Sequence, residues 1–158
     1  MDRVGLQTLK DELLSAAVEA AAALDAARQR RQTPGPVGLE AAGFQLARLY
    51  NIVEQMALRV AKAFESNIDD ESRWHAELMR RLSIEIQGVR PALWCPALMP
   101  PLGQLRGFRH VFNHAYDFAI DPERLALVIR DAETVVRELP GAVDAFIAEV
   151  ARREGWKI

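Results

Sequence analysis

The sequence predicts an all-α fold, an antiparallel bundle of four to five helices that forms a single domain over residues 1–158. Half of the residues are hydrophobic, which is enough to bury a core in a chain of this length. Apolar residues recur at three- and four-residue steps through long segments, whereas no segment shows the alternation typical of strands. Prolines, glycines and helix-capping residues fall between these segments and mark their ends.

Two long helices and a tight turn account for the first part of the chain. Val4 to Arg31 carries a stripe of leucines and alanines, and the arginines near its end suit the negative end of the helix dipole. A segment rich in proline and glycine, Gln32 to Val37, stops this helix. The second helix should run from Gly38 to about Ser66. Because the turn is short, we expect the two helices to pack as an antiparallel hairpin.

A third helix and a proline-rich connection follow. We expect the helix from Ser72 to about Gln87, with core contributions from Trp74, Leu78, Leu82, Ile84 and Ile86. We interpret Trp74 as an anchor beside a surface His75. Four prolines exclude a continuous helix over residues 88–101, but the segment is apolar, so we expect an ordered, partly buried connection. Its Cys95 has no base nearby in the sequence, and we expect this thiol to pack.

The last part of the chain contains two further predicted helices. The first extends from about Leu102 to Phe118. The second begins at Asp121-Pro122-Glu123, where an aspartate N-cap precedes a proline at the first helical position. Pro140-Gly141 should break or kink this helix, which resumes from Val143 to Glu154.

The stretch from Leu105 to Ala119 holds the side chains best suited to chemistry. On a helix, its leucine, valine, alanines and phenylalanines fall on one face. The opposite face carries Arg106, Arg109, His110, Asn113, His114 and Tyr116. Arg109 and His114 are about 140° apart around an ideal helix, which is too far for a tight pair within one helix. We therefore predict that this helix works against a second copy of itself in a two-fold homodimer.

The polar face suits metal-independent cleavage of RNA. A histidine can act as general acid or base near neutral pH, and an arginine can hold a phosphate bidentately and stabilise charge that develops on it. Together they suffice for attack of a 2′-hydroxyl on the adjacent phosphate. The sequence has no glycine-rich phosphate loop, which argues against nucleotide hydrolysis.

The segment from Arg109 to Tyr116, Arg-His-Val-Phe-Asn-His-Ala-Tyr, resembles the R-x-x-x-x-H-x-Y signature of the HepT toxins in the HEPN superfamily. HEPN motifs commonly place a polar residue after the arginine, and His110 fits this pattern. The flanks 105–110 and 120–125, and the stretches 74–78 and 86–91, are also similar to HepT-like sequences. The resemblance thus covers roughly the last two-thirds of the chain.

This resemblance implies an all-helical bundle that dimerises so that two motif helices face each other. It implies a ribonuclease in which Arg109 and His114 are catalytic, with Arg106, His110 and Asn113 supporting the site or binding the RNA phosphate. It also implies a partner, a minimal nucleotidyltransferase antitoxin that adds AMP to the motif tyrosine, here Tyr116. A bulky anion there would occupy the positive charge that the RNA phosphate needs.

Three alternatives compete with the ribonuclease. His110 and His114 have a metal-ligand spacing, with Asp117, His75 or Cys95 as third ligands, but a second spaced pair is lacking, and we expect no metal and no cofactor. A catalytically inactive module that binds a nucleotidyltransferase would use the polar face as an interface. A nucleic-acid-binding domain would stack bases on Phe108, Phe112 and Tyr116, although the first two fall on the apolar face.

The bulk properties bound the environment of the protein. The formal net charge of −2 argues against a domain that coats nucleic acid through net electrostatics. A single cysteine cannot form an internal disulfide, which favours a reducing compartment. Acidic residues interrupt the alanine-rich stretch, and the first residues lack an apolar signal core, so we expect a cytoplasmic protein without membrane contact.

Overall fold

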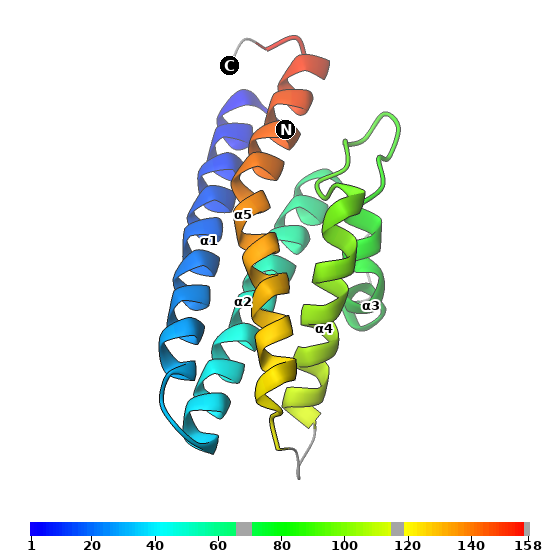
Figure 1. Cartoon of the computed structure of the whole chain (residues 1–158). Helices are drawn as coiled ribbons and strands as arrows, with labels where there is room; N and C mark the ends of the chain where they lie inside the picture. The colour runs from blue at the N-terminus through cyan, green and yellow to red at the C-terminus, as the bar shows by residue number, and fades with distance from the viewer. Residues whose placement is uncertain (66–70, 115–118, 157–158) are drawn as a thin grey trace.

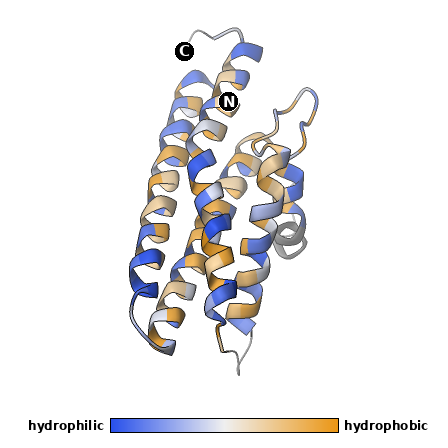
Figure 2. Ribbon diagram, in the orientation of Figure 1, coloured by the Kyte–Doolittle hydropathy of each residue, from blue (hydrophilic) through white to orange (hydrophobic). Residues whose placement is uncertain are grey.

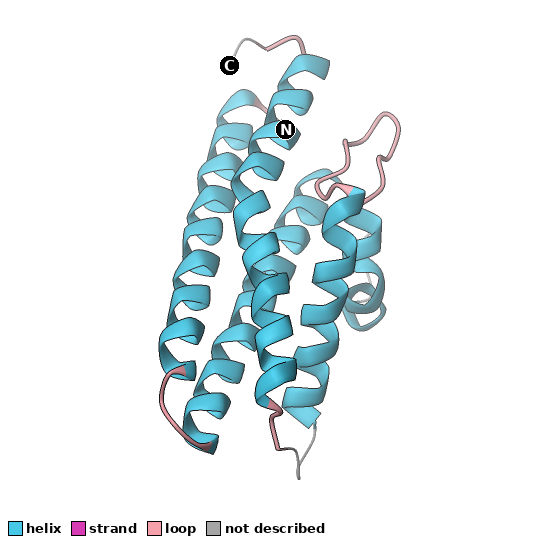
Figure 3. Ribbon diagram, in the orientation of Figure 1, coloured by secondary structure: helices cyan, strands magenta, loops and turns pink. Residues whose placement is uncertain are grey.

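A computed structural model of the protein describes residues 1–65, 71–114 and 119–156, and the side chains of 71–76 are excluded from the description. Helices dominate these residues (Figures 1 and 3), namely α1 (Arg3–Arg31), α2 (Pro36–Phe64), α3 (Glu71–Leu82), the short 3-10 helix η1 (Pro96–Leu98), α4 (Met99–His114) and α5 (Pro122–Arg153). The described residues contain no strand, only an isolated bridge between Ile86 and Arg90. The predicted all-α class is confirmed.

The helices pack side by side as an elongated bundle (Figure 1). Helices α1 and α2 form the expected antiparallel hairpin, and α5 lies against both. Helix α4 packs between α2 and α5, and α3 packs on α2. The hairpin turn depends on Gly35, whose φ of 84° lies in the left-handed region, and on Pro36, which opens α2.

One hydrophobic core includes residues from all five α-helices. In α1, small alanines such as Ala20, Ala23 and Ala27 are fully buried, which lets α2 and α5 approach closely. In Figure 2 the helices carry apolar and hydrophilic residues side by side, as expected of amphipathic helices around a shared core. No helix among the described residues is long and apolar enough to cross a membrane.

Helix α3 ends at Leu82, five residues before the predicted end. Leu78 and Leu82 are buried as expected, but Ile84 is 49% exposed and Ile86 is only half-buried, so neither contributes to the core as predicted. The prediction for Trp74 and His75 falls on side chains outside the description. The helix stops because a side chain from farther along the chain, Arg90, occupies its last carbonyl groups.

Arg90 is the centre of a buried polar network. Its Nη2 donates to the backbone oxygen of Arg81 (3.1 Å), and its Nη1 donates to those of Ile84 (3.0 Å) and Pro91 (3.1 Å). Its Nε and Nη2 both lie 2.8 Å from Glu65 Oε1. Arg81 donates to the other oxygen of Glu65 at 2.6 Å. The network joins the end of α2, the end of α3 and the following connection.

That connection is ordered and partly buried, as predicted. Leu93, Trp94 and Leu98 are buried in it. Cys95, by contrast, is exposed, which corrects the expectation that its thiol packs. The residue precedes η1, and its backbone oxygen accepts the amide of Leu98, so the tight turn directs its side chain outward.

Two prolines and a third one changed the expected bounds of the last helices. Helix α4 begins at Met99, earlier than predicted, because Pro100 and Pro101 occupy its first turn, where an amide hydrogen is not needed. Helix α5 runs through Pro140 without interruption, so the predicted break is wrong (Figure 1). Leu139 and Val143 are fully buried on either side of this proline, and their packing holds the helix together.

Candidate active site

Helix α4 has the two faces that its sequence predicts. Leu105 and Phe108 are buried in the core, and Phe112 is half-buried against α2. The exposed residues of the polar face are Arg106, His110, Asn113 and His114. The helix assignment ends at His114, and Ala119, expected on the apolar face, is exposed because it lies beyond that end. Tyr116 and Asp117 fall outside the described residues.

Arg109 lies between the two faces and turns toward α2. Its Nη1 donates to Asn51 Oδ1 and to Glu54 Oε2, both at 2.8 Å, and its Nη2 donates to Glu54 Oε1 at 3.2 Å. The guanidinium carbon also lies 4.5 Å from the centre of the Tyr50 ring. The bidentate carboxylate and the aromatic face together fix both the plane and the direction of the guanidinium.

The acceptors on α2 are themselves well buried. The Glu54 side chain is 6% exposed, and Arg109 supplies it with a charged partner of the kind that a buried carboxylate requires. Tyr50 is fully buried, and its hydroxyl has no hydrogen-bond partner. Burial, followed by the nearby charge of Glu54, raises the pKa of Tyr50 to about 12, while the positive charges of Arg109 and Arg106 oppose this rise. Tyr50 therefore stays neutral.

His114 is oriented by the backbone of its own helix. Its Nδ1 lies 2.9 Å from the backbone oxygen of His110. A carbonyl oxygen can only accept, so Nδ1 carries the hydrogen and the neutral imidazole keeps its lone pair on Nε2. The His110 and His114 rings stack, with centres 4.6 Å apart and an angle of 27° between their planes. Nε2 is thus the basic atom of an exposed and pre-oriented side chain.

The structure brings some of the predicted site residues together and keeps others apart. His110 and His114 touch, whereas Arg109 is held by α2, and no hydrogen bond links it to His114 among the described residues. This separation agrees with the angle expected on an ideal helix. The same residues contain no group of three or more His, Cys, Asp or Glu that could hold a metal. Of the suggested third ligands, Asp117 and the side chain of His75 lie outside the description.

Sequence reasoning missed the part of the site that α2 supplies, which is Tyr50, Asn51 and Glu54. A signal was present, because Glu54 falls inside the apolar stripe of α2, between the buried Val53 and Met56. An acidic residue on a buried stripe needs a cation close by. What the sequence lacks is any sign of which cation, since the two partners are 55 positions apart.

Comparison with protein-family models matches residues 41–150, more than half of the chain, to a family described as HepT-like protein. The chain belongs to this family. The matched region of this HepT-like protein contains most of α2 and all of α4, and hence every residue of the site described above. Searches of curated proteins and of solved structures gave no match.

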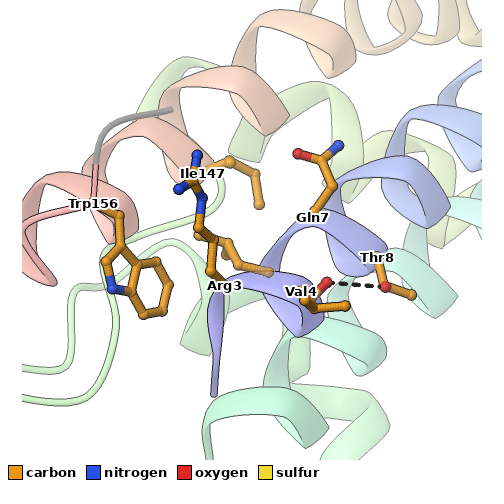
Figure 4. A pocket seen from close by; sticks show the side chains of 7 residues that line it. Arg3, Val4, Gln7, Thr8, Ile147 and Trp156 are labelled. Atoms are coloured by element: carbon orange, nitrogen blue, oxygen red, sulfur yellow. Dashed lines mark hydrogen bonds between the residues drawn. The ribbon is translucent and has the colours of Figure 1, made fainter.

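A separate cavity of about 440 Å³ lies between the first turns of α1 and the end of α5 (Figure 4). Leu6, Ile147 and Trp156 form much of its apolar wall, and Arg3 and Gln7 are its polar side chains. The hydroxyl of Thr8, also in the wall, is engaged with the backbone oxygen of Val4 at 3.0 Å. The cavity lies toward the opposite end of the bundle from the C-terminal end of α4 (Figure 1).

Proposed function

We propose that this HepT-like protein is the toxin of a toxin–antitoxin pair and acts as a metal-independent endoribonuclease. HepT-like proteins are a group of the HEPN superfamily associated with toxin–antitoxin systems, and that membership supports a toxin. In the proposed reaction, His114 is the general base and Arg109 holds the phosphate, with Arg106, His110 and Asn113 supporting the site or contacting RNA.

The observation that carries the proposal is the hydrogen bond between His114 Nδ1 and the His110 carbonyl oxygen. With Nδ1 protonated, Nε2 can accept the proton of a ribose 2′-hydroxyl. The 2′ oxygen then attacks phosphorus, the bond from phosphorus to the 5′ oxygen breaks, and the departing oxygen takes up a proton. The products are a 2′,3′-cyclic phosphate end and a 5′-hydroxyl end. Charge that develops on the phosphate oxygens would be stabilised by Arg109.

The separation of Arg109 from His114 supports a shared site in a homodimer. Within one chain, Arg109 is held against α2, whereas His114 lies on the exposed side of α4. A two-fold axis beside α4 would bring His114 of one copy toward Arg109 of the other. Such a cleft would let a single RNA phosphate meet both groups.

The proposed partner is a minimal nucleotidyltransferase that neutralises the toxin by adding AMP to Tyr116. Tyr116 follows α4 directly and belongs to the same motif as Arg109 and His114. An added phosphate there would compete with RNA for the arginines of the polar face. Because the substrate is cellular RNA, we assign the activity to the cytoplasm.

His114→Ala tests the proposed function. Loss of a general base typically costs about 10²- to 10⁴-fold in rate, so cleavage of RNA and inhibition of growth should both disappear while circular dichroism is unchanged. Gln104→Ala, at an exposed position of the same helix, should behave as wild type. Cleavage should persist in excess chelator. If wild type and His114→Ala are equal in both assays, the protein is not this ribonuclease.

A second candidate function is an inactive helical module that binds a nucleotidyltransferase. The bidentate pair between Arg109 and Glu54 favours it, because it gives Arg109 a structural task that needs no substrate. In this case the partner would co-purify equally with wild type and His114→Ala, and neither would cleave RNA.

A further inference from the structure

Arg109 keeps one edge of its guanidinium open. An arginine has five N–H donors, and three of them are taken, two by Glu54 and one by Asn51. Glu54 occupies the end-on edge, formed by Nη1 and Nη2, and Asn51 takes the second hydrogen of Nη1. The Nε hydrogen and the second Nη2 hydrogen have no acceptor among the described residues. They point in the same direction and form the side-on edge of the group.

We propose that Tyr50, Asn51 and Glu54 form a cradle that positions Arg109 so that its side-on edge is a bidentate clamp for an RNA phosphate. Two parallel N–H groups match two oxygens of a phosphate, which is the most directional contact that an arginine can make with an anion. The inference rests on the proposed function and adds three positioning residues to it. None of the three needs to touch the substrate.

The arrangement is suited to positioning because every degree of freedom of the guanidinium is restrained. Tyr50 covers one face of the group, which fixes its plane. The carboxylate of Glu54 fixes rotation within that plane, and Asn51 holds the corner nearest α2. All three lie within five residues of one helix, and a rigid helix places a site more accurately than a loop does. The Arg109 side chain remains 21% exposed, so its open edge can be reached.

The charge of Glu54 acts against its geometry. A carboxylate beside the guanidinium lowers the positive potential that an RNA phosphate meets, so an opposite hypothesis is that Glu54 withholds Arg109 from substrate. Positioning predicts that removing the Glu54 charge weakens binding and catalysis. Withholding predicts that the same change strengthens them. The sign of the effect therefore decides between the two.

The test is a double-mutant cycle on binding of a 2′-O-methyl RNA oligonucleotide, which lacks the 2′-hydroxyl needed for cleavage. Arg109→Ala should weaken binding by about tenfold, the cost of losing one charge-assisted bidentate contact. Glu54→Gln should weaken it several-fold, and the double variant should bind no worse than Arg109→Ala alone. Arg109→Ala leaves a buried carboxylate without its partner, so the double variant also provides a form of the Arg109 substitution without that burden.

Kinetics on cleavable RNA add a second readout. Glu54→Gln should lower kcat at least about tenfold, because a misdirected clamp fails most in the transition state, and Glu54→Asp should restore part of the loss. Glu40→Gln, which makes the same charge change at an exposed position of α2, should have no effect. Thermal unfolding confirms that each variant is folded.

Binding or turnover by Glu54→Gln that equals or exceeds wild type overturns the cradle, as does wild-type protein that fails to bind the oligonucleotide. Independent losses that add in the double variant overturn it as well. Failure of the proposed ribonuclease is a different result, in which wild type does not cleave RNA while the binding cycle still couples Glu54 to Arg109.

Discussion

Replacement of Arg90 by methionine should destabilise the protein strongly. Arg90 has no exposed side-chain surface and donates to three backbone oxygens and to the carboxylate of Glu65. Methionine fills a similar volume but donates nothing. The substitution therefore leaves the last carbonyl groups of α3 and one oxygen of a buried carboxylate without their donor.

The size of the effect follows from these contacts. Removing one partner of a buried ion pair costs about 3–5 kcal/mol, and each buried acceptor left unpaired costs about 1–3 kcal/mol. Arg81 continues to neutralise Glu65 from the other side, which favours the lower part of the range, about 3 kcal/mol. Since native proteins are stable by only about 5–15 kcal/mol, Arg90→Met should lose a large fraction of its stability.

Urea unfolding followed by circular dichroism measures this loss. With a slope of about 2 kcal/mol/M, the midpoint should fall by about 1.5 M. The matched control is Arg80→Met, because the Arg80 side chain is 69% exposed and its nearest acidic oxygen, on Glu77, lies 4.0 Å away. This control should change stability by less than about 0.5 kcal/mol. An Arg90→Met protein within about 1 kcal/mol of wild type would refute the argument that the buried network stabilises the fold.

Two further predictions concern stability. In Gly38→Ala, the new Cβ would overlap the backbone oxygen of Thr33 in the hairpin turn, so the protein should lose about 1–3 kcal/mol in urea unfolding, whereas Gly103→Ala, where space is open, should gain up to about 1 kcal/mol; equal effects would contradict the close approach. Hydrogen bonds first from Arg152 and then from Arg153 lower the pKa of Glu149 to about 2, below its ordinary value of 4.5, so this carboxylate stabilises the folded state above pH 4.5 and loses that effect as the pH falls toward 2. The melting temperature of Glu149→Gln should therefore lie below that of wild type at pH 7, with the difference closing at low pH and in high salt, and a difference that is constant with pH would exclude this linkage.

Much of the architecture could be predicted because it depends on local pattern. The hairpin of α1 and α2 follows from two apolar stripes and a turn that contains Gly35 and Pro36, all within one stretch of chain. Errors occurred where a distant residue decides a local outcome. Helix propensity favours continuation beyond Leu82, but the side chain of Arg90 takes the carbonyl groups at that point. Pro140 is tolerated inside α5 because packing of the residues around it outweighs one lost hydrogen bond.

The candidate site divides in the same way. The exposed stack of His110 on His114 and the carbonyl contact that orients His114 are interactions between positions four apart on one helix, which periodicity anticipates. The partners of Arg109 could not be anticipated, since Asn51 and Glu54 precede it by 58 and 55 positions.

By itself, the sequence determined the all-α class, the two faces of α4 and the separation of Arg109 from His114, because each depends on the geometry of a single helix. Only the tertiary structure decided what Arg109 does on the inner side. Packing of α2 against α4 brings a buried carboxylate to the guanidinium, and a carboxylate removed from water must bind a cation. That requirement fixes the guanidinium and leaves its outer edge open to an anion.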